Sequence, residues 1–400
     1  MAEKHNFGIQ PVTCHTWNKD RTGLALSLNS SEVQLYKKNA NKWQPTHTLT
    51  EHGQRVTSID WAANSNKIVT CGADRNAYVW TMNEDGSWKP NLVILRINRA
   101  ATFVKWSPNE RKFAVGSGAR LISVSYYEDE NNWWVSKHIK KPIRSTVTCI
   151  DWHPNSVLLA AGSTDFKARV FSGYIKEYDT KPDASSWGTK MTFGTLLAEH
   201  SNGSGGWVHS VSFSPSGDRL VWVGHDSSVN VVDAAKESLL ATVKGTFLPF
   251  KSVTWVTENS IVASGYDCNP MLFTYDNGGK LNLIKKLDEA QKKESGTMRQ
   301  DSYNSISSFD LDNENNSDEN EEEYSVFSAM NRFKSLDSHA TAGDSTSELK
   351  TQHQNTITQV CIFSGTKSNC SKFSTSGVDG NIIIWDVKSL EKSIAGLKIA

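Results

Sequence analysis

The chain has 400 residues, and its 43 basic and 43 acidic side chains give a formal net charge of zero at pH 7. This balance argues against binding to nucleic acid or to a membrane surface through bulk charge. No segment reaches the roughly 18 apolar residues of a membrane span, and the N-terminus lacks the apolar core of a signal peptide. The six cysteines contain no CxxC pair and the eleven histidines no metal-ligand spacing. We therefore expect a reduced, soluble, cytoplasmic protein without a metal or cofactor.

An internal repeat runs along the chain. Tryptophans that follow short apolar segments recur at intervals of 44, 45 and 46 residues, at Trp17, Trp61, Trp106 and Trp152. Intervals of this length are typical of the four-stranded blades of a β-propeller. The series continues with Phe213, Trp255 and Phe363. Seven such positions predict an all-β fold, a seven-bladed β-propeller, with blades that begin near residues 11, 55, 99, 146, 207, 249 and 356.

Aspartates recur in a tight turn of five blades, at Asp74, Asp165, Asp226, Asp267 and Asp379, and each is followed six residues later by an apolar or aromatic side chain. An Asp in such a turn accepts backbone N–H bonds, which favours a structural role for all five. The pattern resembles that of WD-repeat propellers, in which this Asp belongs to a buried His–Ser/Thr–Asp–Trp network. The resemblance implies two networks, one of His52, Thr70, Asp74 and Trp80 and one of His353, Ser374, Asp379 and Trp385.

Closing the ring requires one more outer strand, because an open propeller exposes an unpaired strand edge. The candidates are the N-terminal segment Asn6–Gln10 and the C-terminal segment Ala395–Ile399. The sequence does not decide between them.

Two intervals of the repeat are longer than one blade. Trp152 and Phe213 are 61 residues apart, and the polar stretch Tyr178–Ser204 carries the excess. Trp255 and Phe363 are 108 residues apart, which leaves room for a long insertion between the sixth and seventh blades.

This insertion is predicted over residues 288–350, between blades one to six (1–287) and blade seven with the ring closure (351–400). Its segment Asp310–Glu323 is acidic and Asn-rich with almost no apolar side chain, a composition typical of disorder. Residues 324–337 follow as a predicted short amphipathic helix, since apolar side chains recur there at helical spacing, at Val326, Met330, Phe333 and Leu336.

The predicted helix either packs on the propeller as a small satellite core or binds a partner. Fully burying four such side chains contributes roughly 6–12 kcal/mol. Ordering the backbone of about twelve residues costs about 1–2 kcal/mol for each residue, which consumes most or all of that gain. We therefore expect weak binding by the helix alone and stronger binding once the propeller itself is docked.

Few residues indicate catalysis, and we expect that the protein is not an enzyme. His225 and Asp226 resemble an acid–base pair, but Asp226 occupies the repeated turn position, so its predicted role is structural. The glycine-rich stretch His200–Gly206 is not followed by the Lys-Ser/Thr of a phosphate-binding loop and is predicted to be a flexible connection.

A basic segment at the entry to blade four is the better candidate for a binding site. It holds Lys137, Lys140, Lys141 and Arg144 directly after a pair of tryptophans, and Lys167 and Arg169 belong to the same blade. These side chains form either an ordinary solvated surface or a docking patch for an acidic peptide. RNA is the poorer alternative ligand, because the chain as a whole is not basic.

Specific stretches resemble the WD-repeat subunit of the actin-related protein 2/3 complex, the assembly that nucleates branched actin filaments. The longest are NNWWVSKHIKKPIRSTVTCIDWHP and LLAAGSTDFKARVFSGYIKEY within residues 131–178, and HTWNKDRT, VTSIDWA and IIIWDVKSLE agree as well. That family also carries a helix around an R-F-x-x-L-D core in the same insertion, here Arg332–Asp337.

The resemblance implies a non-catalytic scaffold that binds the actin-related subunits and helps bind the acidic tails of nucleation-promoting factors. It also implies that the insertion helix contacts an actin filament through its apolar stripe, with Arg332 and Lys334 in support. The expected location is the cytoplasmic actin cytoskeleton, in cortical actin patches. The alternative is a WD-repeat adaptor of another assembly, such as a ubiquitin-ligase substrate receptor.

Overall fold

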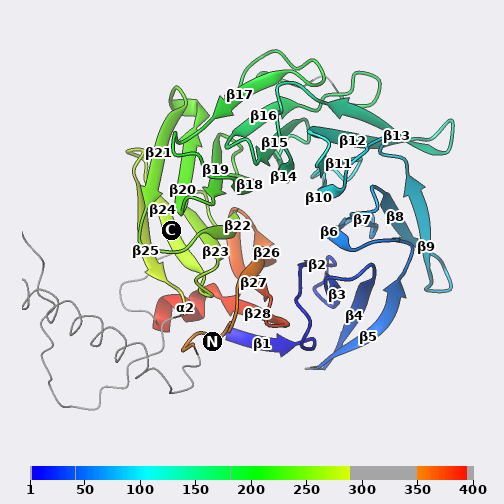
Figure 1. The fold of residues 1–400 in the computed structure, drawn as a ribbon, viewed down its shortest axis with the longest axis horizontal. Coiled ribbons are helices and arrows are strands. Elements are labelled where there is room, and N and C mark those ends of the chain that lie inside the picture. The colour runs from blue at the N-terminus through cyan, green and yellow to red at the C-terminus, as the bar shows by residue number, and fades with distance from the viewer. Residues whose placement is uncertain (1, 41, 181, 289–348, 394–400) are drawn as a thin grey trace, which may run out of the picture. The chain divides into compact units, whose positions relative to one another are not determined.

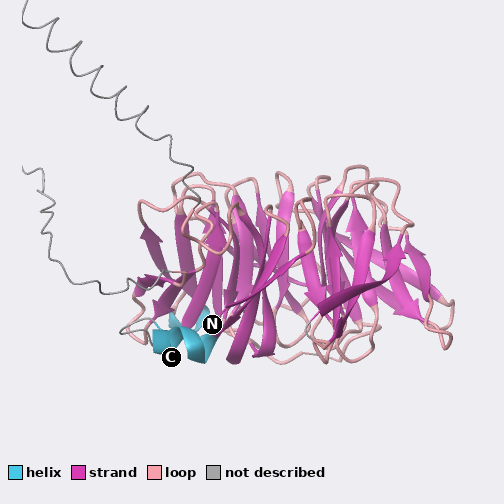
Figure 2. Ribbon diagram, turned by 90° about the horizontal axis from the view of Figure 1, so that it is seen from below, coloured by secondary structure: helices cyan, strands magenta, loops and turns pink. Residues whose placement is uncertain are grey.

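The strands form seven four-stranded antiparallel sheets arranged in a ring (Figure 1). The structure is a computed structural model that describes residues 2–40, 42–180, 182–288 and 349–393. Each sheet is one blade, and the innermost strands of successive blades pack side by side around the ring, with β2 of blade one next to β26 of blade seven. The prediction of a seven-bladed β-propeller is confirmed. Viewed from the side, the strands run between two faces that carry the loops (Figure 2).

The first four blades follow one another in the sequence. Blade one comprises β2 (Cys14–Trp17), β3 (Gly23–Ser27), β4 (Val33–Asn39) and β5 (Lys42–Leu49). Blade two comprises β6 (Val56–Trp61), β7 (Ile68–Gly72), β8 (Ala77–Met82) and β9 (Trp88–Val93). Blade three comprises β10 (Ala101–Trp106), β11 (Lys112–Ser117), β12 (Leu121–Glu128) and β13 (Trp133–Ile139). Blade four comprises β14 (Val147–Trp152), β15 (Leu158–Ser163), β16 (Ala168–Ser172) and β17 (Leu196–His200).

The remaining blades hold the two short helices found among the described residues. Blade five comprises β18 (Val208–Phe213), β19 (Arg219–Gly224), β20 (Ser228–Asp233) and β21 (Leu239–Lys244), with the 3-10 helix η1 (Ala234–Lys236) before its last strand. Blade six comprises β22 (Phe250–Trp255), β23 (Ser260–Gly265), β24 (Met271–Tyr275) and β25 (Leu281–Lys286). Blade seven comprises β26 (Ile357–Thr366), β27 (Asn369–Gly377), β28 (Asn381–Asp386) and the N-terminal β1 (Ala2–Asn6), and α2 (Val387–Ser393) follows β28.

The N-terminal strand closes the ring. β1 pairs antiparallel with β28, with Ala2 opposite Trp385 and Asn6 opposite Asn381. The closing segment therefore lies in the N-terminal region, but it ends where the predicted segment Asn6–Gln10 begins. The C-terminal candidate Ala395–Ile399 lies outside the described residues.

The aromatic repeat holds its register in six blades and shifts by one residue in the seventh. Trp61 and Trp255 lie opposite Ile68 and Ile261 in the neighbouring strand, as the repeat predicts. In blade seven this place opposite the second strand is taken by Ile362, and a bulge separates Ile362 from Ser364. The prediction for Phe363 is therefore wrong by one position, because a bulge adds one residue to one strand of a pair.

The hydrophobic core lies between the blades rather than inside any one of them. Among the described residues, buried side chains form seven clusters, one between each pair of neighbouring blades. Trp255 of blade six, for example, belongs to the same cluster as Val221 and Val231 of blade five. The repeated aromatic residue is thus the side chain with which a blade covers its neighbour, which accounts for five of the fourteen tryptophans.

Strand direction sorts the loops into two faces. Because the four strands of a blade alternate in direction, the connection that enters a blade and the turn between its second and third strands emerge at the same face. We call this the entry face. The turns that hold the five repeated aspartates and the connection from β13 to β14 all lie there. The insertion follows β25 and precedes β26, so the described ends of its connection lie on the entry face as well.

A buried ion pair fixes the long connection from β16 to β17 against blade three. Lys112 is fully buried, and its ammonium donates hydrogen bonds to Asp179 and to the carbonyl of Gly173. Further along the connection, Trp187 is buried and donates to the carbonyl of Gly217 in blade five. The polar stretch that the sequence marked as excess length therefore packs against blades three to five.

Candidate functional site

The predicted basic patch lies at the junction of blades three and four on the entry face. Lys137 is on β13, and Lys140, Lys141 and Arg144 follow in the connection to β14, where all three side chains are exposed. Lys137 is only half-exposed, and its ammonium lies 3.2 Å from a carboxylate oxygen of Glu177. The structure thus keeps three of the four predicted cations unpaired among the described residues and gives the fourth a partner.

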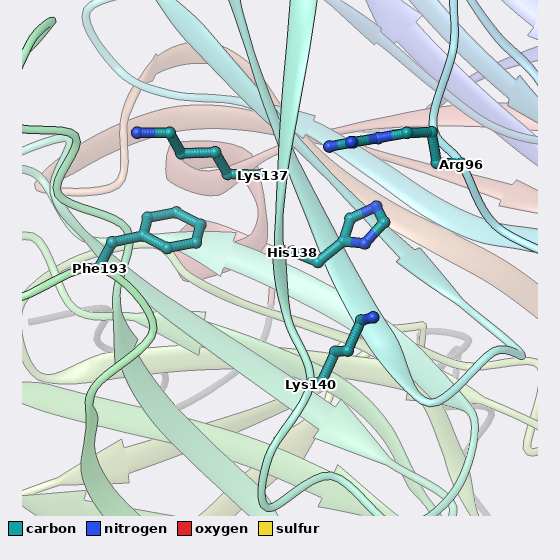
Figure 3. Close-up of a pocket in the computed structure, with 5 residues that line it drawn as sticks. All are labelled: Arg96, Lys137, His138, Lys140 and Phe193. Carbon is teal, nitrogen blue, oxygen red and sulfur yellow. The ribbon is translucent and has the colours of Figure 1, made fainter.

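Three adjoining depressions share lining residues, and Arg144 lines none of them. Together they form the basic groove, which runs past Lys137, Lys140 and Lys141. Its outer part, a depression of about 600 Å³, is lined by Arg96, Lys137, His138, Lys140 and Phe193. In Figure 3, Arg96 and Phe193 lie on opposite sides of this depression, with the three side chains of the β13 segment between them. Arg96 and Lys140 also line the next depression, of about 570 Å³, which includes Arg120 and Lys141. Arg120 also lines the innermost part, which has a volume of about 770 Å³. Its other lining residues include Arg99, Thr102 and Thr146.

The groove is lined by cations without anions. Among the described residues, no Asp or Glu lines any of its three parts. None of Arg96, Arg99, Arg120, Lys140 and Lys141 forms an ion pair with a described carboxylate. A concave surface lined by one sign of charge concentrates the field and attracts an oppositely charged ligand. The geometry therefore suits an extended anionic chain that lies along the groove.

Lys167 and Arg169, the other two cations predicted for this surface, do not add to the charge of the groove. Lys167 forms an ion pair with Glu199, and Arg169 lies 2.9 Å from Asp165 and 2.7 Å from Glu199. Their positive charges are balanced within the blade, so these two side chains add little to the charge of the groove.

Sequence reasoning missed the three arginines of the groove: Arg96, Arg99 and Arg120. Arg96 and Arg99 belong to the connection that enters blade three, and Arg120 to the turn between its second and third strands. A signal was available, because connections and turns of neighbouring blades emerge at the same face of a propeller. Combining the blade assignment with the positions of the arginines places all three beside Lys140 and Lys141.

Each repeated aspartate links the turn between the second and third strands of its blade to the connection that enters the blade. Asp74, Asp165, Asp267 and Asp379 each accept a backbone N–H from that connection, from Gly53, Arg144, Leu248 and Gln354 respectively. Asp226 accepts instead from the side chains of Asn202 and Ser204. Burial alone raises the pKa of Asp226, but hydrogen bonds from Ser204, Ser228, Asn202 and Lys244 outweigh it and lower the pKa to about 2. An aspartate engaged in this way is part of the turn.

Blade two contains the predicted four-residue network. His52 Nδ1 lies 3.0 Å from Asp74 Oδ2 and His52 Nε2 lies 2.9 Å from Thr70 Oγ1, which also accepts the indole N–H of Trp80 at 3.0 Å. Since Asp74 only accepts, the ring proton lies on Nδ1, and Nε2 accepts from the threonine hydroxyl. These hydrogen bonds connect the turn that holds Asp74 to the middle of the blade.

The second network forms with Thr375 in place of the predicted Ser374. His353 Nε2 lies 2.8 Å from Thr375 Oγ1, which accepts the indole N–H of Trp385 at 2.9 Å, and His353 Nδ1 lies 3.1 Å from Asp379. Ser374 points to the other side of the strand, toward blade one, and accepts the indole N–H of Trp17. Successive side chains of a strand alternate between its two faces, so a shift of one residue changes the blade that is contacted.

Some sequence-based expectations are not addressed by the described residues. The predicted actin-contacting side chains from Val326 to Leu336 lie outside them. Within the described ranges, no group of three or more His, Cys, Asp or Glu side chains is arranged to hold a metal ion. In the same ranges no helix is both long and apolar enough to cross a membrane.

The fold and the buried networks define the class of the protein. The family model described as WD domain, G-beta repeat matches residues 43–81, 136–172 and 343–386, so the chain is a WD-repeat β-propeller. Actin-related protein 2/3 complex subunit 1A-B of Xenopus laevis is 56% identical over 396 residues, which cover 99% of each chain.

More distant relatives carry the same name. Actin-related protein 2/3 complex subunit 1 of Schizosaccharomyces pombe is 45% identical over 380 residues, 94% of this chain and 97% of its own. Subunit 1B of Arabidopsis thaliana is 40% identical over 397 residues, 98% of each chain. The chain therefore belongs to the family of actin-related protein 2/3 complex subunit 1.

Proposed function

We propose that this chain is a non-catalytic scaffold subunit of an actin-related protein 2/3 complex and supports the nucleation of branched actin filaments. The observation that carries the proposal is the 56% identity over 99% of the chain to a relative named as that subunit. Its partners are then the actin-related proteins and the other subunits of the complex. Its location is the actin cytoskeleton, in cortical actin patches.

The test is an affinity purification of the tagged full-length chain, with its stoichiometric partners identified by mass spectrometry. We expect two actin-related proteins and a fixed set of smaller subunits. A purification that recovers a ubiquitin-ligase scaffold and no actin-related protein contradicts the proposal and supports the adaptor alternative instead.

The basic groove is the proposed docking site for the acidic tails of nucleation-promoting factors. Three features support this assignment. The groove is elongated, its lining holds Arg96, Arg120, Lys140 and Lys141 without a described acidic residue, and it opens on the loop-bearing entry face. Charge complementarity of this kind accelerates the encounter of two partners and selects among them.

The insertion helix, residues 324–337, is the proposed contact with an actin filament. In this proposal the stripe of Val326, Met330, Phe333 and Leu336 faces actin, and Arg332 and Lys334 approach its acidic surface. Fully burying four apolar side chains is worth roughly 6–12 kcal/mol before the cost of ordering the segment, so the contact matters most when the complex already holds the filament.

Deleting residues 324–337 is expected to reduce branch formation by about tenfold or more in a pyrene–actin assay and in microscopy of branches. Residues 310–323 offer a matched control, because this deletion also removes 14 residues but no apolar stripe. The control is expected to branch normally. Unchanged branching after the first deletion, with all subunits still present, means that the helix assignment is wrong.

A further inference from the structure

The first two strands of blade seven are longer than their counterparts in the other blades. β26 has 10 residues and β27 has 9, whereas the first two strands of the other six blades have between 4 and 6 residues each. The extra residues form a hairpin whose tip is Lys367 and Ser368. Because this hairpin joins the first strand of the blade to the second, its tip lies on the face opposite the entry face.

The hairpin is bent near its tip. Register shifts in the pairing of β26 with β27 lie on both sides of Ser364, and a bulge bends the strand that contains it. Gly365 has a φ of 87°, and a Cβ there would lie 2.0 Å from the carbonyl oxygen of Asn369, so this position requires glycine. Beyond the bend the hairpin lies against blade six, where the backbone N–H of Cys370 donates to the carbonyl of Val256 at 3.0 Å.

The tip reaches past blade six to blades four and five. The Lys367 ammonium lies 2.6 Å from Oδ2 of the buried Asp151, on β14 of blade four. It also donates to Ser212 Oγ at 2.9 Å and to the carbonyl of Phe213 at 3.3 Å, both on β18 of blade five. An ammonium group has three N–H donors, so each donor finds an acceptor. One side chain of blade seven therefore contacts the innermost strands of two blades that are not its neighbours.

Asp151 has a counterpart in blade two that is paired locally. Asp60 and Asp151 each precede a repeated tryptophan, and each accepts, at 2.8 Å, the backbone N–H of the repeated aromatic residue in the next blade. Beside Asp60 the cation is Lys105 of blade three, at 3.3 Å, which directly precedes that aromatic residue. Ser212 holds the same place in blade five and carries no charge. Lys367 thus supplies from blade seven the cation that blade five lacks.

Blade seven is also the blade that its neighbours constrain least. The insertion separates β25 from β26, and a long connection restrains the segments that it joins less than a short one does. On the other side, the buried cluster between blades seven and one has the fewest buried members of the seven clusters among the described residues. The closing strand β1 comes from the other end of the chain. A contact with blades four and five is therefore most useful in this blade.

We propose that Lys367 locks blade seven into the ring by anchoring it on blades four and five. The lock holds β26, the strand that follows the insertion, in place when the pairing of β1 with β28 opens or the packing against blade one loosens. Compensating the charge of Asp151 does not by itself require a residue of blade seven, since Lys105 compensates Asp60 from the adjacent blade. The bent hairpin and the three acceptors of its ammonium instead indicate a contact that spans the ring.

Hydrogen exchange of the full-length chain, followed by mass spectrometry, tests the lock. Lys367→Met keeps the length of the side chain and removes its charge, and we expect exchange in residues 357–386 and 2–6 to become about tenfold faster or more. Lys367→Met/Ser212→Lys gives Asp151 a local cation in the way that Lys105 serves Asp60. In this double variant we expect the melting temperature to recover about half or more of its fall, because no buried charge is stranded. Exchange in blade seven is expected to remain fast, because the contact across the ring is still missing.

Lys105→Met is the matched control, since it breaks an ion pair between two adjacent blades. It is expected to accelerate exchange in blades two and three and to leave blade seven at the wild-type rate. Unchanged exchange of blade seven in Lys367→Met overturns the lock, and so does equal acceleration of blade seven in Lys105→Met.

Restoration of wild-type exchange in blade seven by Ser212→Lys also overturns the lock, because Lys367 then only neutralises Asp151. Lys367→Met/Asp151→Asn gives a second test that does not depend on how a lysine fits at position 212. It removes both charges, so fast exchange confined to blade seven supports the lock, and wild-type exchange there contradicts it.

Discussion

Lys140→Glu/Lys141→Glu weakens the binding of an acidic activator tail by about 30-fold at low salt and leaves the fold intact. Both side chains are exposed, so the substitutions remove no buried contact and are expected to change stability little. Reversing two lysines changes the local charge by four units, within a groove that has no described acidic residue to oppose it.

The magnitude follows from Coulomb's law. A unit charge at about 8 Å from a ligand charge in water contributes about 0.5 kcal/mol, and a change of four units gives about 2 kcal/mol, or about 30-fold. The Debye length falls from about 30 Å at 0.01 M salt to about 3 Å at 1 M, so the effect is expected to fade as salt is added. Anisotropy titrations of a labelled tail at several salt concentrations measure both quantities.

A control with the same change in net charge separates the groove from the rest of the surface. Lys388 and Lys392 are exposed on α2, which follows β28 and therefore lies on the face opposite the groove. Lys388→Glu/Lys392→Glu is expected to change the affinity by less than about twofold at moderate salt, because the distance exceeds the Debye length. Equal losses for both double variants indicate an effect of net charge, and no loss in the first means that the tail binds elsewhere.

The repeated elements of this fold are readable from the sequence, whereas the full groove is not. The regular spacing of Trp17, Trp61, Trp106 and Trp152 reflects a physical requirement, since each blade needs a large side chain to cover its neighbour. The groove, in contrast, is assembled from segments of blade three, from the connection to blade four and from Phe193 in the β16–β17 connection. Only its contiguous part, Lys137–Arg144, forms a visible run of charge.

Two sequence predictions were wrong by one residue. One lies at a bulge of β26, and the other lies where successive side chains of β27 face opposite sides of the strand. Thr375 precedes Trp385 by ten residues, as Thr70 precedes Trp80, so the interval that identifies the network member was present in the sequence. The neighbouring Ser374 has the right chemistry but faces blade one. Ring closure was undecided because it depends on pairing between the two ends of the propeller, and neither end carries a pattern that names its partner.

Lys112→Ala is expected to lower the free energy of unfolding by about 3–5 kcal/mol, because removing one member of a buried ion pair leaves the other charge uncompensated. Lys112 is fully buried, and its partner Asp179 also accepts the backbone N–H of Ile175 at 2.8 Å. The ammonium lies 5.3 Å from the ring centre of Trp152, so the substitution removes a cation–π contact as well. Guanidinium unfolding followed by tryptophan fluorescence measures the loss.

Two further variants test the cause of the loss. Lys112→Ala/Asp179→Asn removes the stranded charge and is expected to recover roughly 1–3 kcal/mol, whereas a simple cavity effect predicts no recovery. Arg111→Ala, at the exposed neighbour that stacks on Tyr178, is expected to cost less than about 1 kcal/mol.

Lys112→Ala also tests whether the buried ion pair positions the wall of the groove. Asp179 anchors the beginning of the β16–β17 connection, and Phe193 near its end lines the outer part of the groove. If the ion pair fixes this connection, Lys112→Ala weakens binding of an acidic tail even under conditions where the chain remains folded, and hydrogen exchange rises first in residues 173–195. Unchanged exchange in that segment means that the pair stabilises blades three and four without positioning the groove wall.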